Sequence, residues 1–309
     1  TDDKESKSKR ILSIDAKAVT HVELIRSNQT IVLEKSGDNW DIKKPLAVRA
    51  DYSNVSSLLD ELEFAERTRS LSETDLKGAN LADFGLTAPR LTIKLQSKTG
   101  AAALNIGGET PAKDALYVSV AGQKGVAVVR KTTFDRANQT LDQLRSRTVI
   151  EFQPASVTRL ELKGIELTRS NAWTLTRPFP ARVDQSKISE LLTDLENLRA
   201  QDFVSDKPED VHTYHLDEPD REVALYTGPA GKTLQLGKPL TNDATKVYAK
   251  LKGSDSIVTI NAEAAKKFAV QINDLRDPRV LPVSAADVKG LEITRGADKL
   301  ALQRQDTGW

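Results

Sequence analysis

The spacing of apolar residues along the chain predicts both helices and strands. In segments 55–62 and 188–195, apolar side chains fall at positions i, i+3, i+4 and i+7, which places them on one face of a helix. In segments 91–95 and 223–225, apolar and polar residues alternate, as in a strand with one buried face. Short connections that contain glycine, such as 98–100, favour antiparallel pairing. We therefore expect amphipathic helices and antiparallel strands in one chain.

These elements belong to a long internal repeat. The helix patterns at 55–62 and 188–195 are 133 residues apart, and the same distance separates Trp40 from Trp173. Other residues recur around them at matching or nearly matching spacings. The repeat landmarks are Trp40, Pro45, Asp51, Gly85, Pro89, Gly107, Tyr117 and Arg145 in the first copy, and Trp173, Pro178, Asp184, Pro219, Gly237, Tyr248 and Arg276 in the second.

Each copy is long enough to bury its own core, so we predict tandem α+β domains rather than a solenoid. Each domain is expected to contain an opening hairpin, an amphipathic helix, a small antiparallel sheet and a short closing helix. The predicted organisation is a charged linker at 1–10, a first unit at 11–152, a second unit at 153–282, and the start of a third, truncated unit at 283–309.

The segment from 283 onward repeats the opening of the two earlier copies. Leu291 and Ile293 lie 131 residues after Leu160 and Leu162, and Trp309 stands at the tryptophan position. The chain stops just after a strand-like pattern, without a terminating helix. We therefore expect the natural protein to continue beyond Trp309.

The start of the chain has the composition of a solvated linker. Residues 1–10 contain seven charged residues and no apolar one. The chain does not begin with methionine, so we expect that a segment before Thr1 has been removed. A membrane-spanning helix needs a run of about 18 apolar residues, and the sequence contains none. Membrane attachment is therefore predicted only through a segment that is absent from this chain.

Charge and cysteine content narrow the function classes. Lys and Arg total 45 and Asp and Glu total 44, which gives a net charge of +1 and argues against a nucleic-acid binder. The absence of cysteine excludes disulfides, thiolate zinc sites and cysteine nucleophiles. Basic stretches at 4–10 and 43–44 have acidic neighbours, so we interpret them as solvated surface rather than as lipid-binding patches.

Two short patterns suggest ligand chemistry, and a structural interpretation is favoured for both. Segment 228–233 has two residues between its glycines, where a phosphate-binding loop has four, and we predict a hairpin turn there. His212 and His215 are three residues apart, with Asp210 and Asp217 nearby, but the segment has the pattern of a loop. We predict no catalytic residue, no cofactor and no metal.

The remaining candidates are interpreted as parts of the fold. Trp40 and Trp173 are predicted to pack in the core, with a role as ligand platforms as the alternative. Arg145 and Arg276 are expected to interact with a helix C-terminus or a nearby acid, with an interface role as the alternative. The carboxylates assigned to a solvated helix face are Glu61, Glu63 and Glu66.

Four groups of landmarks resemble the uncharacterised bacterial family DUF4340. They are Trp40–Pro45 with Asp51, Phe84–Leu86 with Pro89, Leu104–Gly107 with Tyr117, and Leu144–Arg145. The resemblance recurs in the second copy and covers nearly the whole chain. His215 departs from the pattern, which has glycine at that position, so the turn conformation there is expected to differ.

Members of the family usually carry an N-terminal membrane helix, face outward from the cytoplasmic membrane, and are often encoded beside ABC-type transporter components. The resemblance implies the same placement here. We therefore predict a non-enzymatic scaffold or interaction module, located in the periplasm or on the outer face of the cytoplasmic membrane. It would be tethered by a missing N-terminal segment and accessory to an ABC-type envelope transport complex. Exposed strand edges are the expected docking elements for a protein partner.

Two alternatives remain open. The first is a module that binds envelope glycan or peptide, with Tyr117 and Tyr248 as contacts, and an exposed aromatic groove would favour it. The second is a metal-dependent hydrolase that uses His212 or His215, and a cleft with a bound metal would favour it.

Overall fold

The computed structural model describes residues 8–309, except residues 73, 77, 282 and 307. The chain forms two compact units, Thr1–Arg147 and Thr148–Trp309. The division lies five residues before the predicted boundary between 152 and 153. The difference arises because Ile150 is already buried in the core of the second unit, with Val149 packed beside it.

Arg10 belongs to the first unit rather than to the predicted linker at 1–10. Its backbone pairs with Glu66, and its guanidinium lies 3.8 Å from the Glu63 carboxylate. The next residue, Ile11, donates a backbone hydrogen bond to Ala65 at 2.9 Å. Residues 1–7 of the predicted linker lie outside the described residues.

The described part of the first unit contains strands, one long helix and several short helical segments. In chain order, its elements are η1 (Ala16–Ala18), β1 (Val19–Ile25), β2 (Thr30–Ser36), β3 (Asn39–Lys44), β4 (Val48–Arg49), α2 (Tyr52–Phe64), β5 (Arg67–Leu71), β6 (Leu91–Ser97), β7 (Gly100–Glu109), β8 (Ala115–Val120), β9 (Val126–Arg130), α3 (Lys131–Ala137) and α4 (Leu141–Leu144).

The second unit repeats this order of elements. They are η2 (Pro154–Ser156), β10 (Arg159–Leu162), β11 (Ile165–Arg169), β12 (Trp173–Arg177), β13 (Ala181–Arg182), α5 (Gln185–Glu196), β14 (Asp202–Ser205), η3 (Pro208–Val211), β15 (Arg221–Tyr226), β16 (Gly231–Pro239), β17 (Lys246–Leu251), β18 (Ile257–Asn261), α6 (Ala262–Lys266) and α7 (Ile272–Leu275).

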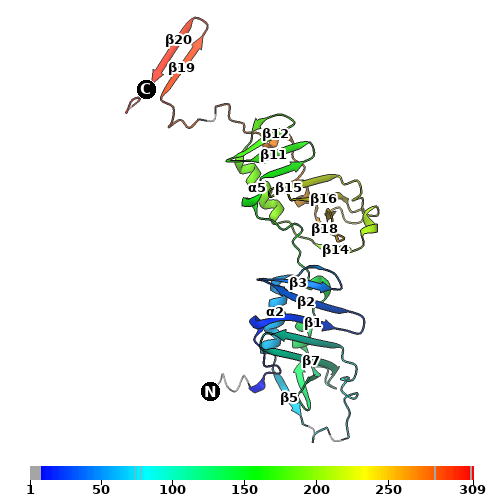
Figure 1. Ribbon diagram of the computed structural model, residues 1–309. Coiled ribbons are helices and arrows are strands. Elements are labelled where there is room, and N and C mark those ends of the chain that lie inside the picture. The colour runs from blue at the N-terminus through cyan, green and yellow to red at the C-terminus, as the bar shows by residue number, and fades with distance from the viewer. Residues whose placement is uncertain (1–7, 73, 77, 282, 307) are drawn as a thin grey trace. The chain divides into compact units, whose positions relative to one another are not determined.

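Both units build the same nine-stranded antiparallel sheet (Figure 1). The strand order is β4-β3-β2-β1-β6-β7-β8-β9-β5 in the first unit and β13-β12-β11-β10-β15-β16-β17-β18-β14 in the second. The predicted tandem α+β organisation is therefore confirmed. Each sheet is larger than expected from the sequence, because the opening hairpin joins it through the β1–β6 and β10–β15 pairs.

An amphipathic helix packs against each sheet. The Asp51 carboxylate accepts a hydrogen bond from the backbone N of Asn54 at 2.9 Å and starts α2. Asp184 starts α5 in the same way, through the backbone N of Ser186 at 2.9 Å. The apolar stripes predicted from the sequence are the buried faces, formed by Val55, Leu58, Leu59 and Leu62 in α2 and by Ile188, Leu191, Leu192 and Leu195 in α5. In the described part of the chain, no helix has both the length and the apolar character needed to cross a bilayer.

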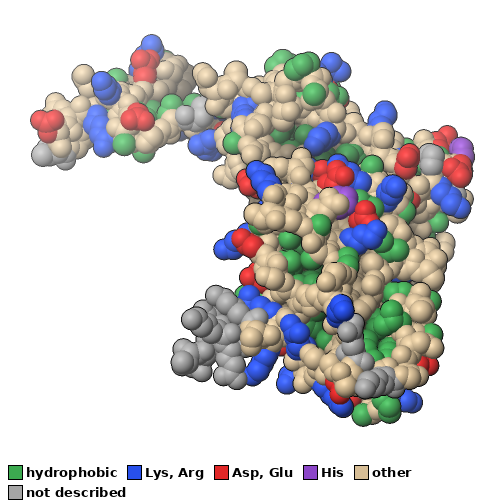
Figure 2. Space-filling model, turned by 60° about the horizontal axis from the view of Figure 1, so that its bottom comes forward, with side chains coloured by type: hydrophobic (Ala, Val, Ile, Leu, Met, Phe, Trp, Pro, Cys, Tyr) green, Lys and Arg blue, Asp and Glu red, His purple; other side chains and the backbone are tan. Residues whose placement is uncertain are grey.

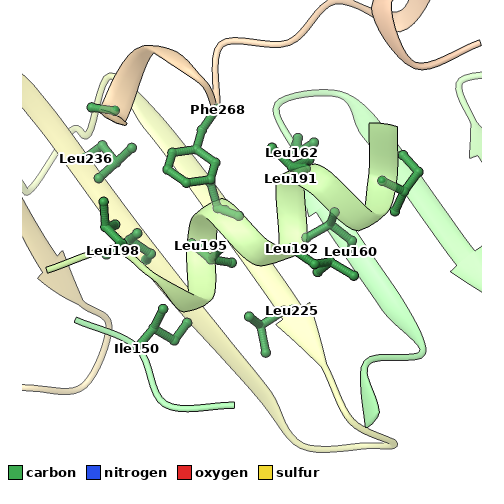
Figure 3. Packing of buried hydrophobic residues seen from close by; sticks show 14 of the residues in the cluster. Ile150, Leu160, Leu162, Leu191, Leu192, Leu195, Leu198, Leu225, Leu236 and Phe268 are labelled. Carbon is green, nitrogen blue, oxygen red and sulfur yellow. The ribbon is translucent and has the colours of Figure 1, made fainter. Parts of the chain in front are cut away.

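Figure 3 shows this packing in the second unit. Leu191, Leu192 and Leu195 of α5 lie among apolar side chains from the strands, including Leu160 and Leu225. Burying a leucine side chain stabilises a fold by about 1.5–3 kcal/mol. The helix stripe is therefore a major source of stability in each unit.

The three glutamates assigned to a solvated helix face have different environments. Glu66 lies beyond the end of α2 and pairs with Arg10 instead. Glu63 is half-buried and accepts a hydrogen bond from the backbone N of Ala16 at 3.0 Å. Glu61 is also half-buried and takes part in an ion pair of 3.1 Å. The prediction of a solvated face was wrong for Glu61 and Glu63. Arg136 of α3 pairs with Glu61, and residues 8–18, which enter the unit as a strap, pack against Glu63.

A third sheet consists of one hairpin. It is formed by β19 (Gly290–Arg295) and β20 (Asp298–Gln303). Leu291 pairs with Leu302, and Ile293 pairs with Leu300. The pairs Val22–Leu33 and Leu24–Ile31 of β1 and β2 have the same arrangement. The hairpin thus has the register expected for the opening of a third copy.

Candidate functional site

The repeated tryptophans lie in the two cores. Trp40 on β3 is 3% exposed and Trp173 on β12 is 5% exposed, so neither ring is available as a ligand platform. In the second unit, Gln185 fixes the backbone of Trp173 with hydrogen bonds of 2.8 Å to its N and O atoms. Pro45 and Pro178, which follow the tryptophans, both have cis peptide bonds. These landmarks position the chain for the helix that comes next.

The closing helices dock on the start of the long helices through the backbone. The backbone N of Asp51 donates to the carbonyl of Leu144 at 2.8 Å. In the second unit, the backbone N of Asp184 donates to the carbonyl of Leu275 at 2.9 Å. Each aspartate therefore caps a helix with its side chain and anchors the closing helix with its backbone.

The arginines that follow the closing helices have different environments. Arg145 is buried, and its guanidinium lies 3.9 Å from the Asp142 carboxylate, so the predicted contact with a nearby acid is present. Arg276 is exposed, and its guanidinium lies 5.8 Å from the centre of the Phe179 ring. Their backbones make equivalent bridges, to Ala50 and to Val183, so the two residues differ only in their side-chain environments.

The turn at 84–89 lies directly on strand β7, and glycine makes this approach possible. Gly85 has a φ angle of +66°, and a Cβ atom there would lie 2.8 Å from the backbone N of Gly108. A Cβ atom on Gly107 would lie 2.3 Å from the Phe84 carbonyl oxygen. That oxygen accepts a hydrogen bond from the backbone N of Gly108 at 2.7 Å. Both glycine landmarks are therefore required by backbone packing.

The corresponding turn in the second unit is looser. His215 has a φ angle of +55°, close to the +66° of Gly85, so the expectation of a different turn conformation was wrong. Such an angle is uncommon for a residue with a side chain. A Cβ atom on Gly237 would lie 3.0 Å from the Tyr214 carbonyl oxygen, against 2.3 Å for the equivalent atoms of the first unit. This wider spacing leaves room for the side chain at 215. Pro89 and Pro219 follow the two turns and are both half-buried.

The landmark tyrosines pack against aromatic residues of these turns. The rings of Tyr117 and Phe84 are 4.8 Å apart, and so are the rings of Tyr248 and Tyr214. Both landmark tyrosines are half-buried. Their rings hold the turn on the sheet, so the geometry does not favour them as contacts for glycan or peptide.

The histidine pair lies on an exposed loop. The Nδ1 atom of His212 is 2.7 Å from the Asp217 carboxylate, and this hydrogen bond lowers the pKa of Asp217. The side chain of Asp210 lies outside the described residues. Among the side chains that are described, no group of three or more His, Asp or Glu is placed to hold a metal. Residues 228–230 lie in the predicted hairpin turn between β15 and β16, and residues 231–233 begin β16.

A groove in the first unit, lying along β5, is the strongest candidate for a binding site. Its lining residues come from the entering strap, the end of α2, β5 and the start of α3. The basic residues that line it are Lys9, Arg67, Arg69 and Arg130. The acidic ones are Glu61 and Glu66. We call this feature the β5 groove.

An exposed aromatic side chain lies in the β5 groove. Phe64 is 59% exposed, and the guanidinium of Arg10 lies 4.6 Å from the centre of its ring. Phe64 also lines a second depression that includes Arg136. An exposed aromatic residue beside arginines is a composition that is enriched in protein interfaces.

Strand β5 also offers a backbone edge. It ends the strand order of its sheet and pairs with β9 on one side, and the described chain places no strand on its other side. Arg67 donates to the carbonyl of Arg10 at 2.8 Å, which holds the strap against the start of the strand. Figure 2 looks onto this end of the first unit, where several Lys and Arg side chains reach the surface. The edge combines unused backbone groups with positive charge.

The equivalent strand of the second unit, β14, lacks this chemistry. Asp202 stands where the first unit has Arg69, and its carboxylate accepts hydrogen bonds from Lys246 at 2.8 Å and from Thr259 at 2.6 Å. The bond to Asp202 raises the pKa of Lys246. Asn197 replaces the exposed Phe64. The charges at this edge are thus paired within the unit.

Few features of the sequence indicate the β5 groove. Segment 67–71 reads Arg-Thr-Arg-Ser-Leu and has no alternation of apolar and polar residues, so it was not predicted as a strand. A comparison of the two copies contains the available signal. Where the first copy has Phe64, Arg67 and Arg69, the second has uncharged or acidic residues.

Two copies of one nine-stranded sheet, joined in series and sharing their landmarks, define a tandem-repeat α+β protein. The chain matches the family model described as "Domain of unknown function (DUF4340)" over residues 40–172 and 173–309. Because these matches cover most of the chain, it belongs to this family. No curated protein matches it, and no solved structure does.

The family repeat is offset from the structural unit. Each match begins at or next to a repeated tryptophan, on β3 for the first and on β12 for the second. The hairpin of β10 and β11 therefore falls at the end of the first match, although its strands lie in the second sheet. One family match thus combines most of one sheet with the opening hairpin of the next.

Proposed function

We propose that this protein is a non-enzymatic scaffold or interaction module that acts outside the cytoplasm. In this proposal it is tethered to the membrane on its N-terminal side and serves an ABC-type envelope transport complex. Location, tether and transport role rest on the family resemblance. The observation that carries the docking role is the β5 groove. There, a strand at the end of the described strand order, an exposed Phe64 and three arginines occur together.

The proposed mechanism is strand addition. An extended segment of the partner pairs with the outer edge of β5, and main-chain hydrogen bonds provide the affinity. Arg69 and Arg130 select acidic side chains on that segment, and Phe64 supplies an apolar contact. Charge complementarity of this kind also speeds encounter between partners. The occupant is therefore an extended, acidic segment of a protein.

The position of the entering chain agrees with this role. Arg10 pairs with Glu66, immediately before β5, and Lys9 lines the groove. A tether on the N-terminal side would thus reach the folded unit beside the β5 groove. This arrangement would place the groove close to a partner held in the membrane.

The experiment is a crosslinked pull-down of the natural protein from its native membrane, read by mass spectrometry. We expect a permease or ATPase component of a transporter to be recovered, with crosslinks to Lys9 or to neighbouring residues of the first unit. Recovery of glycan or an unrelated surface protein, without any transporter component, would favour the glycan- or peptide-binding alternative.

A proline in the edge strand provides a second test. Arg69→Pro removes a backbone donor and a charge from β5 and should abolish recovery of the partner. The thermal transition of the first unit must be retained for the result to count. Undiminished recovery by a folded Arg69→Pro variant would rule out strand addition at β5.

A further inference from the structure

The C-terminal segment carries most of the large apolar side chains that the described chain exposes. The residues concerned are Val280, Leu281, Val283, Leu291, Ile293, Leu300 and Trp309. Their exposed fractions range from 44% for Leu291 to 89% for Val280. Such a concentration of exposed apolar residues marks a surface that is covered in the working protein.

The same positions are buried in the complete units. Leu160, the equivalent of Leu291, is fully buried, and Leu162, the equivalent of Ile293, is 5% exposed. Ile150 lies 131 residues before Leu281 and is 1% exposed. The repeat therefore assigns core positions to residues that are exposed in the third copy.

The hairpin has one apolar and one polar face. Leu291 and Ile293 lie on the same face of β19, because side chains two residues apart in a strand point the same way. Leu300 stands opposite Ile293 on β20. The other face carries an ion pair of 3.5 Å between Glu292 and Lys299. A hairpin with this distribution of side chains can be buried on its apolar face, while its polar face stays in solvent.

The second unit shows what covers such a face. Strand β15 pairs with β10, so that Leu225 stands beside Leu160. Helix α5 packs on the same residues through Leu192 and its neighbours (Figure 3). The first unit uses β6 and α2 in the same places. The covering segment is in both cases a helix with an apolar stripe, followed by a strand.

We propose that the apolar face of β19–β20 is the docking surface for a helix-and-strand segment of the α5–β15 type. The segment is supplied by the natural polypeptide beyond Trp309 and completes a third unit. Val280 and Leu281 take the place of Val149 and Ile150 as the apolar strap of that unit. Trp309 then becomes a core residue, like Trp40 and Trp173.

The test compares the 309-residue chain with the natural-length polypeptide by hydrogen exchange and mass spectrometry. We expect the amides of β19 and β20 to exchange at least about tenfold more slowly in the longer protein, because a packed hairpin opens less often. Equal exchange in both proteins would overturn the proposal. So would a natural polypeptide that ends at Trp309, or slowing that requires a separate protein.

A pair of variants on opposite faces of β19 sharpens this test. Ile293→Asp should leave the melting of the 309-residue chain unchanged, because Ile293 is already exposed. In the natural-length protein it should abolish the protection of the hairpin. Thr294→Asp, on the polar face, should keep that protection. Loss of protection in both variants, or in neither, would contradict the assignment of the apolar face.

Discussion

The first and second units share one topology but differ at one end of the sheet. In the first unit, β5 presents Arg67 and Arg69 next to the exposed Phe64. In the second, Asp202 on β14 is neutralised by Lys246. The nine-strand order and the helix stripe are common to both and therefore serve the fold. The features that only one copy has are the better guide to function, because folding does not require them.

The third copy extends this comparison. Its hairpin has the register of β1 and β2 but almost none of their burial. A hairpin alone is marginally stable in water, because it has no second layer to cover its apolar face. The complete units show how much of the fold depends on the helix that follows.

Shortening a buried leucine of the helix stripe should destabilise a complete unit strongly, whereas shortening an apolar residue of the hairpin should have little effect. Leu58→Ala and its equivalent Leu191→Ala should each cost about 3 kcal/mol, because both leucines are buried. Ile293→Ala should change stability by less than about 0.5 kcal/mol in the 309-residue chain. Urea denaturation followed by tryptophan fluorescence measures all three. A similar loss for Ile293→Ala would show that the hairpin already shares a core.

Substitution of the residue with positive φ in the turn should change stability in opposite directions in the two units. Gly85→Ala should destabilise the first unit by about 2 kcal/mol, because of its positive φ and the contact of 2.8 Å with the backbone of Gly108. His215→Gly should stabilise the second unit by up to about 1 kcal/mol, since it relieves a left-handed conformation. Thermal unfolding of both variants checks this. A destabilised His215→Gly variant would mean that the histidine side chain has a structural partner.

The helix caps should be equally important in both units. Asp51→Ala and Asp184→Ala each remove a capping acceptor and should each cost about 1 kcal/mol. Asp51→Asn and Asp184→Asn are the matched controls, because asparagine also caps well. Denaturant unfolding gives the values. A loss confined to one unit would show that the two helices do not begin in the same way.

Acid should weaken the end of the closing helix in the second unit but not in the first. Arg279 holds the Asp277 carboxylate with side-chain and backbone hydrogen bonds and lowers its pKa from 3.8 to about 2. Ser146 stands at the equivalent position of the first unit. Because the folded-state pKa is lowered, the contribution of this ion pair is present above the ordinary value and is lost as the pH falls toward 2. Carbon-13 NMR titration of the carboxyl should show this, and Arg279→Ala should return the pKa toward 3.8. An unchanged titration in that variant would exclude Arg279 as the cause.

Periodicity and repeat spacing predicted the parts of the fold that depend on regular burial. The helix stripes, the buried tryptophans and the turn at 228–233 follow from residues at fixed spacing. The size of the sheets did not follow, because pairing of β1 with β6 joins segments that are far apart in sequence. Burial of Arg145 was also not predicted, because its exposed counterpart Arg276 has the same local sequence context.

The candidate site could not be predicted from sequence patterns for a similar reason. The β5 groove brings together the entering strap, the end of α2 and a short strand without apolar alternation. None of these segments suggests binding on its own. The difference in charge between Arg69 and Asp202 is visible in the sequence, but it gains meaning only when both residues are placed on the last strand of a sheet.

The most direct test of the docking proposal is quantitative recovery of the partner from native membranes by two charge-reversed proteins. One carries Arg69→Glu and Arg130→Glu, two exposed residues that line the β5 groove. The control carries Lys252→Glu and Arg295→Glu, which are exposed and lie outside the first unit. We predict that recovery of the transporter component falls at least about tenfold for the β5 variant and is unchanged for the control. Equal recovery by both proteins would contradict docking at the β5 groove.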